Sequence, residues 1–142
     1  MDRAALDVAL KHGIECGGWC PAGRVDENGV IPPQYPVREL RGAGFAERTR
    51  QNVIDSDATV IFCRGEPHGG TAETIRCCAE SQRPYVVIDE ATCGVADAAA
   101  KLTRLFRDNV VDVLNVAGPR ESEWPGGYGY ASRVLERFFA SL

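Results

Sequence analysis

Three short runs of the sequence are apolar at nearly every position. They are Ala58–Cys63, Tyr85–Ile88 and Val110–Ala117. A strand buried on both faces, as in a parallel sheet covered by helices, has such a continuous apolar pattern, whereas a strand with one solvated face alternates. The three runs therefore predict three buried parallel strands. A shorter strand is expected at Ile14–Gly18, followed by a loop at Trp19–Pro36 that is rich in glycine and proline.

Five other segments carry apolar residues three and four positions apart, which is the spacing of an amphipathic helix. Asp2 and Thr71 are the expected N-caps of the first and third helices. Gly13 and Asn109 are expected to end the first and fourth, and the second is expected at Phe45–Ile54. The apolar stripes are Ala5, Leu6, Ala9 and Leu10 in the first helix, Ile75, Cys78 and Ala79 in the third, Val95, Ala98, Ala99, Leu102, Leu105 and Phe106 in the fourth, and Val134, Leu135, Phe138 and Phe139 in the fifth.

Strands and helices alternate along the chain, and this order predicts an α/β fold. We expect a doubly wound parallel sheet with helices on both faces. Residues 1–142 are enough for a single domain with its own core. The first helix begins at Asp2 with no apolar run before it, so the first strand of the sheet is expected to be truncated.

Two glycine-rich loops, Gly65–Thr71 and Gly118–Gly127, follow the ends of two predicted strands. Ligands of doubly wound sheets bind at the carboxyl ends of the strands, where glycines let main-chain N–H groups approach a phosphate. The candidate anion-binding residues are Gly69, Gly70 and Thr71 in the first loop and Gly118, Arg120 and Ser122 in the second. A charged hydrogen bond from Arg120 would contribute about 1.5–3 kcal/mol. The alternatives are a plain helix cap for the first loop and an ordinary strand-to-helix turn for the second.

Residues outside the two loops allow both functional and structural interpretations. Arg3 lies one residue past the expected N-cap and is directed toward the same strand ends, although a solvated arginine is the simpler interpretation. Arg48 and Asn52 share a face of the second helix, and this face either borders the site or faces solvent. Trp19 and Trp124 lie in loops, where each ring either stacks on a flat heterocycle or anchors its loop.

Two acidic residues after a strand and the histidine of the first loop are weaker candidates. Asp89 and Glu90 follow a strand and fit a turn-forming pair better than a set of ligand contacts. His68 lies inside the first loop, but one histidine without a partner carboxylate makes no catalytic site.

Composition narrows the function classes. The net charge of −4, without a basic run, argues against nucleic-acid binding. No apolar run is long enough to span a membrane. The six cysteines have no zinc-site spacing, so we expect reduced structural thiols and no metal site. Without an export signal in the sequence, a cytoplasmic location is expected.

Several segments together resemble the molybdenum carrier family, the molybdenum-cofactor carrier proteins within the Rossmann-like nucleotide-sensing superfamily. The matching segments are Asp2–Asp7, Gly18–Pro21 with Gly23-Arg24, Ile31-Pro32 with Tyr35-Pro36, Arg48-Thr49 with Asn52-Val53 and Ser56-Asp57, Gly69–Thr71, and Asn115–Ser122 with Pro125-Gly126. The match covers nearly the whole chain.

This resemblance implies a Rossmann-like carrier that binds, stores and delivers the molybdenum cofactor, a phosphorylated molybdopterin, without turning it over. It also implies molybdoenzymes as recipients and a homodimer or homotetramer. The implied cofactor-binding residues are Arg3, Arg48, Asn52, Gly69, Gly70, Thr71, Gly118, Pro119, Arg120 and Ser122. No catalytic residue is assigned.

Members of that family usually begin with a strand and a further glycine-rich turn ahead of the Asp-Arg segment. Met1 stands where the family tends to have valine, and the valine codon GTG also serves as a start codon. We therefore expect that the native chain starts further upstream, with one more strand and a third phosphate loop.

Two other functions remain open. The segment Pro67–Thr71 with Glu73 faintly resembles the loop of the lysine decarboxylase-like phosphoribohydrolases, in which a glutamate assists N-glycosidic cleavage. Here the motif is shorter, and Glu73 lies two residues past Thr71 instead of three. The other alternative is a sensor of a nucleotide-derived ligand.

Overall fold

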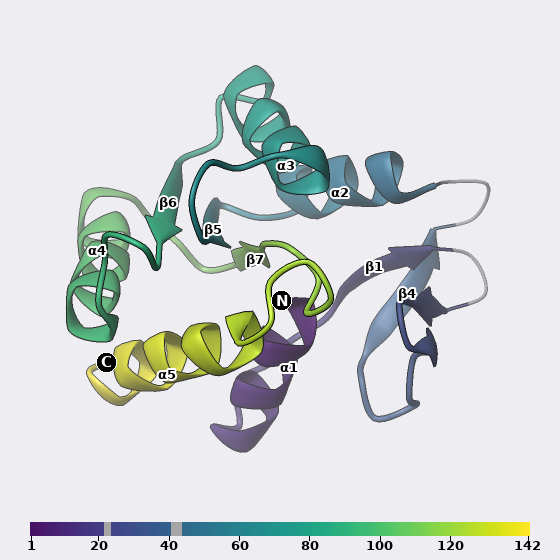
Figure 1. Cartoon of the computed structure of the whole chain (residues 1–142), viewed down its shortest axis with the longest axis horizontal. Coiled ribbons are helices and arrows are strands. Elements are labelled where there is room, and N and C mark those ends of the chain that lie inside the picture. Colours follow the sequence, from purple (N-terminus) through teal and green to yellow (C-terminus); the bar gives the residue numbers. More distant parts are fainter. Residues whose placement is uncertain (22–23, 41–43) are drawn as a thin grey trace.

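A parallel sheet of three strands lies between two layers of helices in the computed structural model, which describes residues 1–21, 24–40 and 44–142 (Figure 1). The helices are α1 (Asp2–Lys11), α2 (Phe45–Ile54), α3 (Gly69–Glu80), α4 (Val95–Asp108) and α5 (Gly127–Ala140). The strands are β1 (Gly18–Pro21), β2 (Val25–Asp26), β3 (Gly29–Val30), β4 (Val37–Leu40), β5 (Ala58–Cys63), β6 (Tyr85–Asp89) and β7 (Leu114–Ala117).

The sheet has the order β6–β5–β7, and both of its strand pairs are parallel. All six residues of β5 are buried, since this strand has a neighbour on each side and a helical layer on each face. The segments α3 and α4 make the two crossovers. A second parallel pair, β1 with β4, lies apart from the sheet, and β2 with β3 forms a short antiparallel hairpin.

Helices cover both faces of the sheet, as the sequence predicts. The larger core lies between the sheet and α1, α4 and α5, and Phe62, Leu102 and Phe138 are fully buried in it. On the other face, α2 and α3 pack together around Val53, Cys77 and Cys78. The prediction of a doubly wound, Rossmann-like α/β fold is therefore confirmed.

The predicted strands at Ala58–Cys63 and Tyr85–Ile88 and the helix at Phe45–Ile54 are also confirmed. The prediction of a strand over the whole of Val110–Ala117 is wrong, because pairing begins only at Leu114. The carboxylate of Asp57 accepts hydrogen bonds from the N–H groups of Asp112 and Val113, both at 2.9 Å. These N–H groups are therefore not available for pairing with a neighbouring strand. Val110 is consequently 88% exposed.

The N-terminal third also differs from its prediction. No strand forms at Ile14–Gly17, and the first strand begins at Gly18. The expected loop Trp19–Pro36 contains most of β1 and the β2–β3 hairpin, and β4 follows it. Gly23, which belongs to that loop and to the family resemblance, lies outside the described residues.

Two helix starts lie earlier than predicted. Met1 is the N-cap of α1, with Asp2 in the first turn, and His68 is the N-cap of α3, with Thr71 buried inside the helix. Their buried faces differ in part from the predicted stripes. In α1 the predicted Leu6 and Ala9 are buried, but Ala4 and Val8 accompany them in place of Ala5 and Leu10, and Leu10 is 46% exposed. In α3, the predicted Cys78 is buried, but Thr71, Thr74 and Cys77 accompany it in place of Ile75 and Ala79.

The end of α1 is as predicted, because Gly13 has a φ of +67° and stops the helix. The N–H groups of Gly13 and Ile14 reach back to the carbonyl oxygens of Leu10 and Ala9, which is the hydrogen-bond pattern of a Schellman motif. No helix in the described part of the chain is both long and apolar enough to cross a membrane.

Candidate functional site

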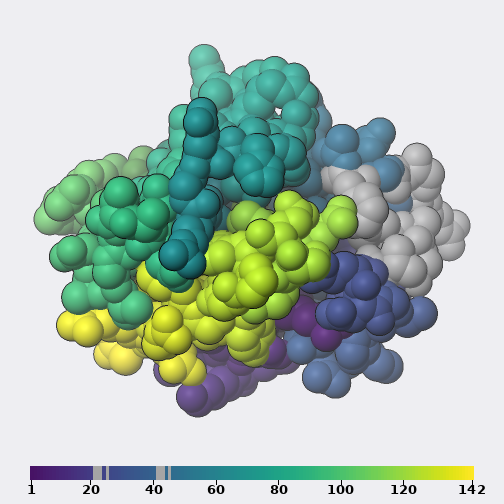
Figure 2. Space-filling view, viewed as in Figure 1, coloured from purple at the N-terminus to yellow at the C-terminus, as the bar shows by residue number. Residues whose placement is uncertain are grey.

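The two glycine-rich loops lie side by side, because β5 and β7 are parallel neighbours and end at the same edge of the sheet. A pocket opens between them. Figure 2 shows the second loop in yellow-green between the teal segment that follows β5 and the blue N-terminal segments. The residues that line the pocket are Cys63, Arg64, Glu66, Pro67, His68, Thr71, Pro119, Glu123 and Trp124.

The first loop leaves the N-terminus of α3 open. No side chain caps this helix, and its N-cap His68 has extended backbone angles. Among the described residues, no hydrogen-bond acceptor meets the main-chain N–H groups of Gly69, Gly70 and Thr71. Gly69 has a φ of +55°, which favours glycine, and a side chain at Gly70 would enter open space. Three free donors at the positive end of a helix form a cradle that suits an anion.

The second loop closes the N-terminus of α5 with one of its own side chains. The carboxylate of Glu121 accepts hydrogen bonds from the N–H of Gly126 at 2.7 Å and from the N–H of Tyr128 at 3.0 Å. These two bonds lower the pKa of Glu121 below its usual range. A negative charge of the protein therefore occupies the place that an anionic ligand would take at this helix.

The other candidates of the second loop have partners within the chain or a packing role. Arg120 is 59% exposed, and its Nε lies 3.6 Å from a carboxylate oxygen of Glu123. The hydroxyl of Ser122 donates a hydrogen bond to the carboxylate of Glu27 in the β2–β3 hairpin. A Cβ at Gly118 would lie 2.7 Å from the carbonyl oxygen of Phe62, so this position needs glycine for close packing. Of the candidate anion-binding residues Gly118, Pro119, Arg120 and Ser122, only Pro119 is in the wall of this pocket.

Trp124 is only 6% exposed, which favours the loop-anchoring interpretation over stacking on a ligand. Its ring packs against Gly127, where a Cβ would lie 2.7 Å from Cε3 of the indole, and its centroid lies 6.0 Å from that of Tyr130. The indole Nε1 is buried without a hydrogen-bond partner among the described residues. An unpaired buried donor on a residue of the pocket wall is a second feature that suits a ligand with acceptor atoms.

The three candidates outside the loops lie in another group of contacts. Arg3 donates from Nε and Nη2 to one carboxylate oxygen of Asp26, at 3.0 and 2.6 Å. Arg48 reaches Asp2 at 3.1 Å. The side-chain amide of Asn52 accepts from the N–H of Trp19 at 2.9 Å and donates to the carbonyl oxygen of the same residue.

The structure therefore places Thr71 and Pro119 in the pocket wall, whereas Gly69 and Gly70 precede Thr71 in the same loop without lining the pocket. Ser122 lies on the side of the second loop that faces α1. Its partner Glu27 and the partner of Arg3, Asp26, belong to the same hairpin. Asn52 and Arg48 lie on α2, toward β1 and the start of α1.

Two acidic positions behave as turn residues or surface residues. Asp89 accepts hydrogen bonds from the N–H groups of Gly65 and Ala91, as the turn-forming interpretation expects. Glu90 lies 3.8 Å from Arg64, one of the residues of the pocket wall.

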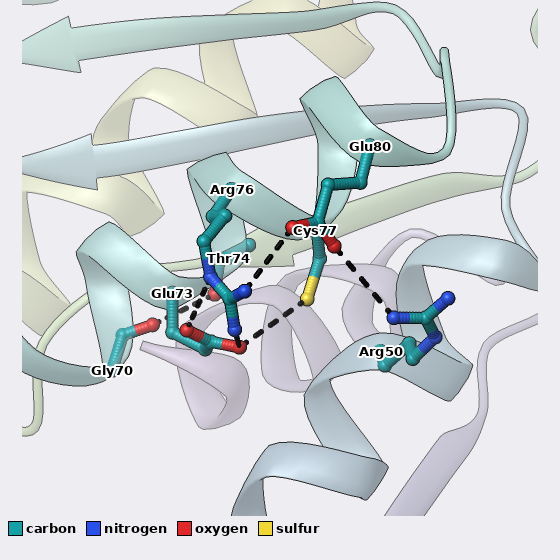
Figure 3. A network of polar contacts seen from close by, with 7 residues as sticks. All are labelled: Arg50, Gly70, Glu73, Thr74, Arg76, Cys77 and Glu80. Carbon is teal, nitrogen blue, oxygen red and sulfur yellow. Dashed lines mark hydrogen bonds and ion pairs between the residues drawn. The ribbon is translucent and has the colours of Figure 1, made fainter.

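Glu73, the residue suggested by the phosphoribohydrolase motif, lies in a network that joins α3 to Arg50 of α2 (Figure 3). Its carboxylate pairs with Arg76 and accepts a contact from the thiol of Cys77 at 3.8 Å. Arg76 also pairs with Glu80, which in turn lies 3.7 Å from Arg50 of α2. The Arg76 guanidinium lowers the pKa of Glu73, which favours the ionised carboxylate. Glu73 is also not among the residues that line the pocket.

All six cysteines are free thiols. Cys63 lines the pocket floor, and burial raises its pKa. Within the described residues, no group of three or more histidine, cysteine, aspartate or glutamate residues could hold a metal ion.

Six residues that line the pocket are neither candidate cofactor-binding residues of the sequence nor its tryptophans: Cys63, Arg64, Glu66, Pro67, His68 and Glu123. Glu66, Pro67 and His68 belong to the glycine-rich loop Gly65–Thr71, which the sequence places at the ligand edge of the sheet, and Arg64 directly precedes that loop. Glu123 has no comparable signal in the sequence.

The fold and the site define a Rossmann-like α/β protein with a candidate anion-binding pocket at the carboxyl edge of its sheet. The chain belongs to the circularly permuted YpsA family of SLOG proteins, whose family model matches residues 1–139. It is also similar to a protein from Syntrophus aciditrophicus named "Putative molybdenum carrier protein", with 39% sequence identity and a TM-score of 0.94. That match covers 96% of this chain and 87% of the other. Among curated proteins, none matches the sequence significantly.

Proposed function

We propose that this protein binds, stores and delivers the molybdenum cofactor, and that the phosphate of the cofactor binds at the N-terminus of α3. The observation that carries this proposal is the set of three N–H groups of Gly69, Gly70 and Thr71, for which the described part of the chain supplies no acceptor. They adjoin a pocket at the carboxyl ends of two parallel strands, where doubly wound sheets bind their ligands.

The chemistry of the pocket wall suits the rest of such a ligand. A pterin carries an amino group and a ring N–H, which are hydrogen-bond donors, and Glu66 and Glu123 supply carboxylate acceptors beside the cradle. The buried Nε1 of Trp124 supplies one donor. The name of the similar Syntrophus aciditrophicus protein supports a molybdenum-related ligand for this chain as well.

The size of the pocket limits how the cofactor would lie. The pocket measures about 30 Å³, whereas pockets that surround a drug-sized ligand measure roughly 300–1,000 Å³. A phosphate group is therefore the largest part of the cofactor that this pocket would take as it stands. The pterin would lie across the neighbouring loop Gly118–Gly127.

A direct retention experiment tests the proposal. The purified protein is incubated with molybdenum cofactor released from a molybdoenzyme, and molybdenum and protein are measured in the fractions of a gel-filtration run. We expect molybdenum to co-elute with the protein in a stoichiometric amount. Elution of all molybdenum with the small molecules would contradict the proposal.

A parallel incubation with AMP separates the other two functions. Retention of intact AMP in place of the cofactor would indicate a nucleotide sensor, and release of adenine would indicate a phosphoribohydrolase. The position of Glu73 outside the pocket wall gives no support to the enzyme.

The family resemblance extends the proposal to molybdoenzymes as recipients and to a homodimeric or homotetrameric assembly. Sedimentation velocity of the purified protein tests the assembly.

A further inference from the structure

The β2–β3 hairpin places two carboxylates on two of the residues that the sequence assigns to anion binding. Asp26 pairs with Arg3, through Nε at 3.0 Å and Nη2 at 2.6 Å. Glu27, the next residue, accepts the hydroxyl hydrogen bond of Ser122. Each carboxylate therefore occupies a donor group that would otherwise be available to a phosphate or another anion.

The base of this hairpin is fixed firmly to the protein. The guanidinium of Arg24 donates to the carbonyl oxygens of Val37 at 2.6 Å, Pro32 at 3.1 Å and Tyr35 at 3.2 Å. The hydroxyl of Tyr35 donates to Asp7 of α1 at 2.8 Å. These contacts hold the two ends of the hairpin together and tie them to a helix of the core.

The tip is held much more weakly. The hairpin has only two residue pairs, Val25 with Val30 and Asp26 with Gly29. None of the described side chains from Asp26 to Val30 is buried, and Val30 is 73% exposed. Among the described residues, the side-chain hydrogen bonds that join the tip to the rest of the protein are those of Asp26 with Arg3 and Glu27 with Ser122. A segment with so few buried contacts opens locally at a low free-energy cost.

The tip also lies against the candidate site. Ser122 belongs to the loop whose other residues, Pro119, Glu123 and Trp124, line the pocket. Arg3 is in the first turn of α1, whose N-cap Met1 contacts the position of Gly118. The hairpin therefore covers the flank of the loop on which the pterin would have to lie.

We propose that the β2–β3 hairpin is a lid, held shut by its own carboxylates, which an anionic ligand displaces from Arg3 and Ser122. This proposal rests on the proposed function, because it describes how access to that same site is regulated. When the lid opens, the guanidinium of Arg3 and the hydroxyl of Ser122 become donors for the ligand. The lid thus makes closure and ligand binding compete for the same two groups.

The test removes both carboxylates without changing the size of the side chains, in a protein with Asp26→Asn and Glu27→Gln. Amide hydrogen exchange of residues 24–31 is measured without ligand, and the association rate of molybdenum cofactor is measured by stopped-flow fluorescence. A matched control carries Glu15→Gln and Asp112→Asn, which remove two exposed carboxylates that form no side-chain hydrogen bond or ion pair with the described residues. Both contacts of the tip are solvent-accessible and each stabilises the closed hairpin only weakly, so we expect hairpin exchange and cofactor association about fivefold faster in the first variant. The control should match the wild type.

The outcomes separate the lid from the function. If the wild type binds cofactor but the two rates are the same in the Asp26→Asn, Glu27→Gln variant as in the wild type, the lid proposal is overturned and the proposed function stands. If hairpin exchange accelerates while neither protein binds cofactor, the proposed function fails, but the carboxylates are shown to hold the hairpin shut. If the control accelerates equally, general charge reduction is the cause and the lid proposal is overturned.

Discussion

The N-termini of α3 and α5 follow two neighbouring strands of one sheet. They differ in whether a carboxylate of the protein binds their main-chain N–H groups. At α3, the N–H groups of Gly69 and Gly70 have no acceptor within the described residues. At α5, the carboxylate of Glu121 accepts from the N–H groups of Gly126 and Tyr128. A glycine-rich loop after a strand therefore does not by itself indicate an anion site. The nearby acidic side chains decide whether the helix end is available to a ligand.

The largest expected effect comes from giving α3 the carboxylate that α5 already has, with Gly70→Asp. An aspartate in the first turn favours the helix, so the variant should fold with unchanged or higher stability. The new charge would occupy and repel the anion site, and we expect cofactor binding to weaken about 100-fold, or about 2.7 kcal/mol. Equilibrium binding of molybdenum cofactor and thermal unfolding measure the two effects.

The control is Gly70→Ala, because a Cβ at this position meets nothing within 4 Å. It should leave binding nearly unchanged. Equal loss of binding in both variants would mean that the side-chain volume matters and not the charge.

Alanine substitutions at the N-termini of α5 and α3 should change the free energy of unfolding by different amounts. A Cβ at Gly127 would lie 2.7 Å from the Trp124 ring, so Gly127→Ala should destabilise the protein by about 1–3 kcal/mol. The same change at Gly70 should instead be neutral or stabilising by about 0.5–1 kcal/mol. Urea unfolding of both variants checks this difference, and an equal effect would contradict the packing role of Trp124.

Removing the carboxylate of Glu121 should cost about 1 kcal/mol of stability, as the loss of a helix cap does. Because the folded-state pKa of Glu121 is lowered, its contribution is present above the pKa of the unfolded chain and is lost as the pH falls through the folded-state pKa. In Glu121→Gln this part of the acid dependence should disappear. Unfolding curves between pH 7 and acidic pH test it, and an unchanged difference between wild type and variant at every pH would contradict it.

The smallest effect is expected from Arg120→Ala. The side chain is 59% exposed and lies near Glu123, so solvent screening limits its contribution to binding to less than about 1 kcal/mol. This is below the range expected from the sequence, because that range assumes a guanidinium directed at the ligand. A decrease in affinity of more than tenfold in a binding titration would instead indicate that Arg120 contacts the anion directly.

The sequence predicts the central sheet well, because burial on both faces leaves a continuous apolar signal in Ala58–Cys63 and Tyr85–Ile88. It fails for β4, whose two central residues, Arg38 and Glu39, are exposed and whose only partner among the described strands is β1. For α1 it is right for Leu6 and Ala9 but wrong for Ala5 and Leu10, since an alanine-rich helix gives similar periodicity for two adjacent faces.

For the site, the sequence predicts the two glycine-rich loops but not the side chains that form hydrogen bonds with the candidate residues. The first loop can be recognised because its donors and glycines are adjacent in the chain. The contact of Ser122 with Glu27 joins residues that are 95 positions apart, and no local pattern predicts it. The pairing of Arg3 with Asp26 is equally invisible before the hairpin is placed.

The cysteines have a consequence for chemical stability. The pKa is raised above its ordinary value, with burial as the largest cause, for Cys16, Cys20, Cys63, Cys77 and Cys78. Since the thiolate is the form that attacks alkylating agents and is oxidised, these sulfur atoms react slowly at neutral pH. At neutral pH these five thiols would therefore be alkylated more slowly than an ordinary surface cysteine.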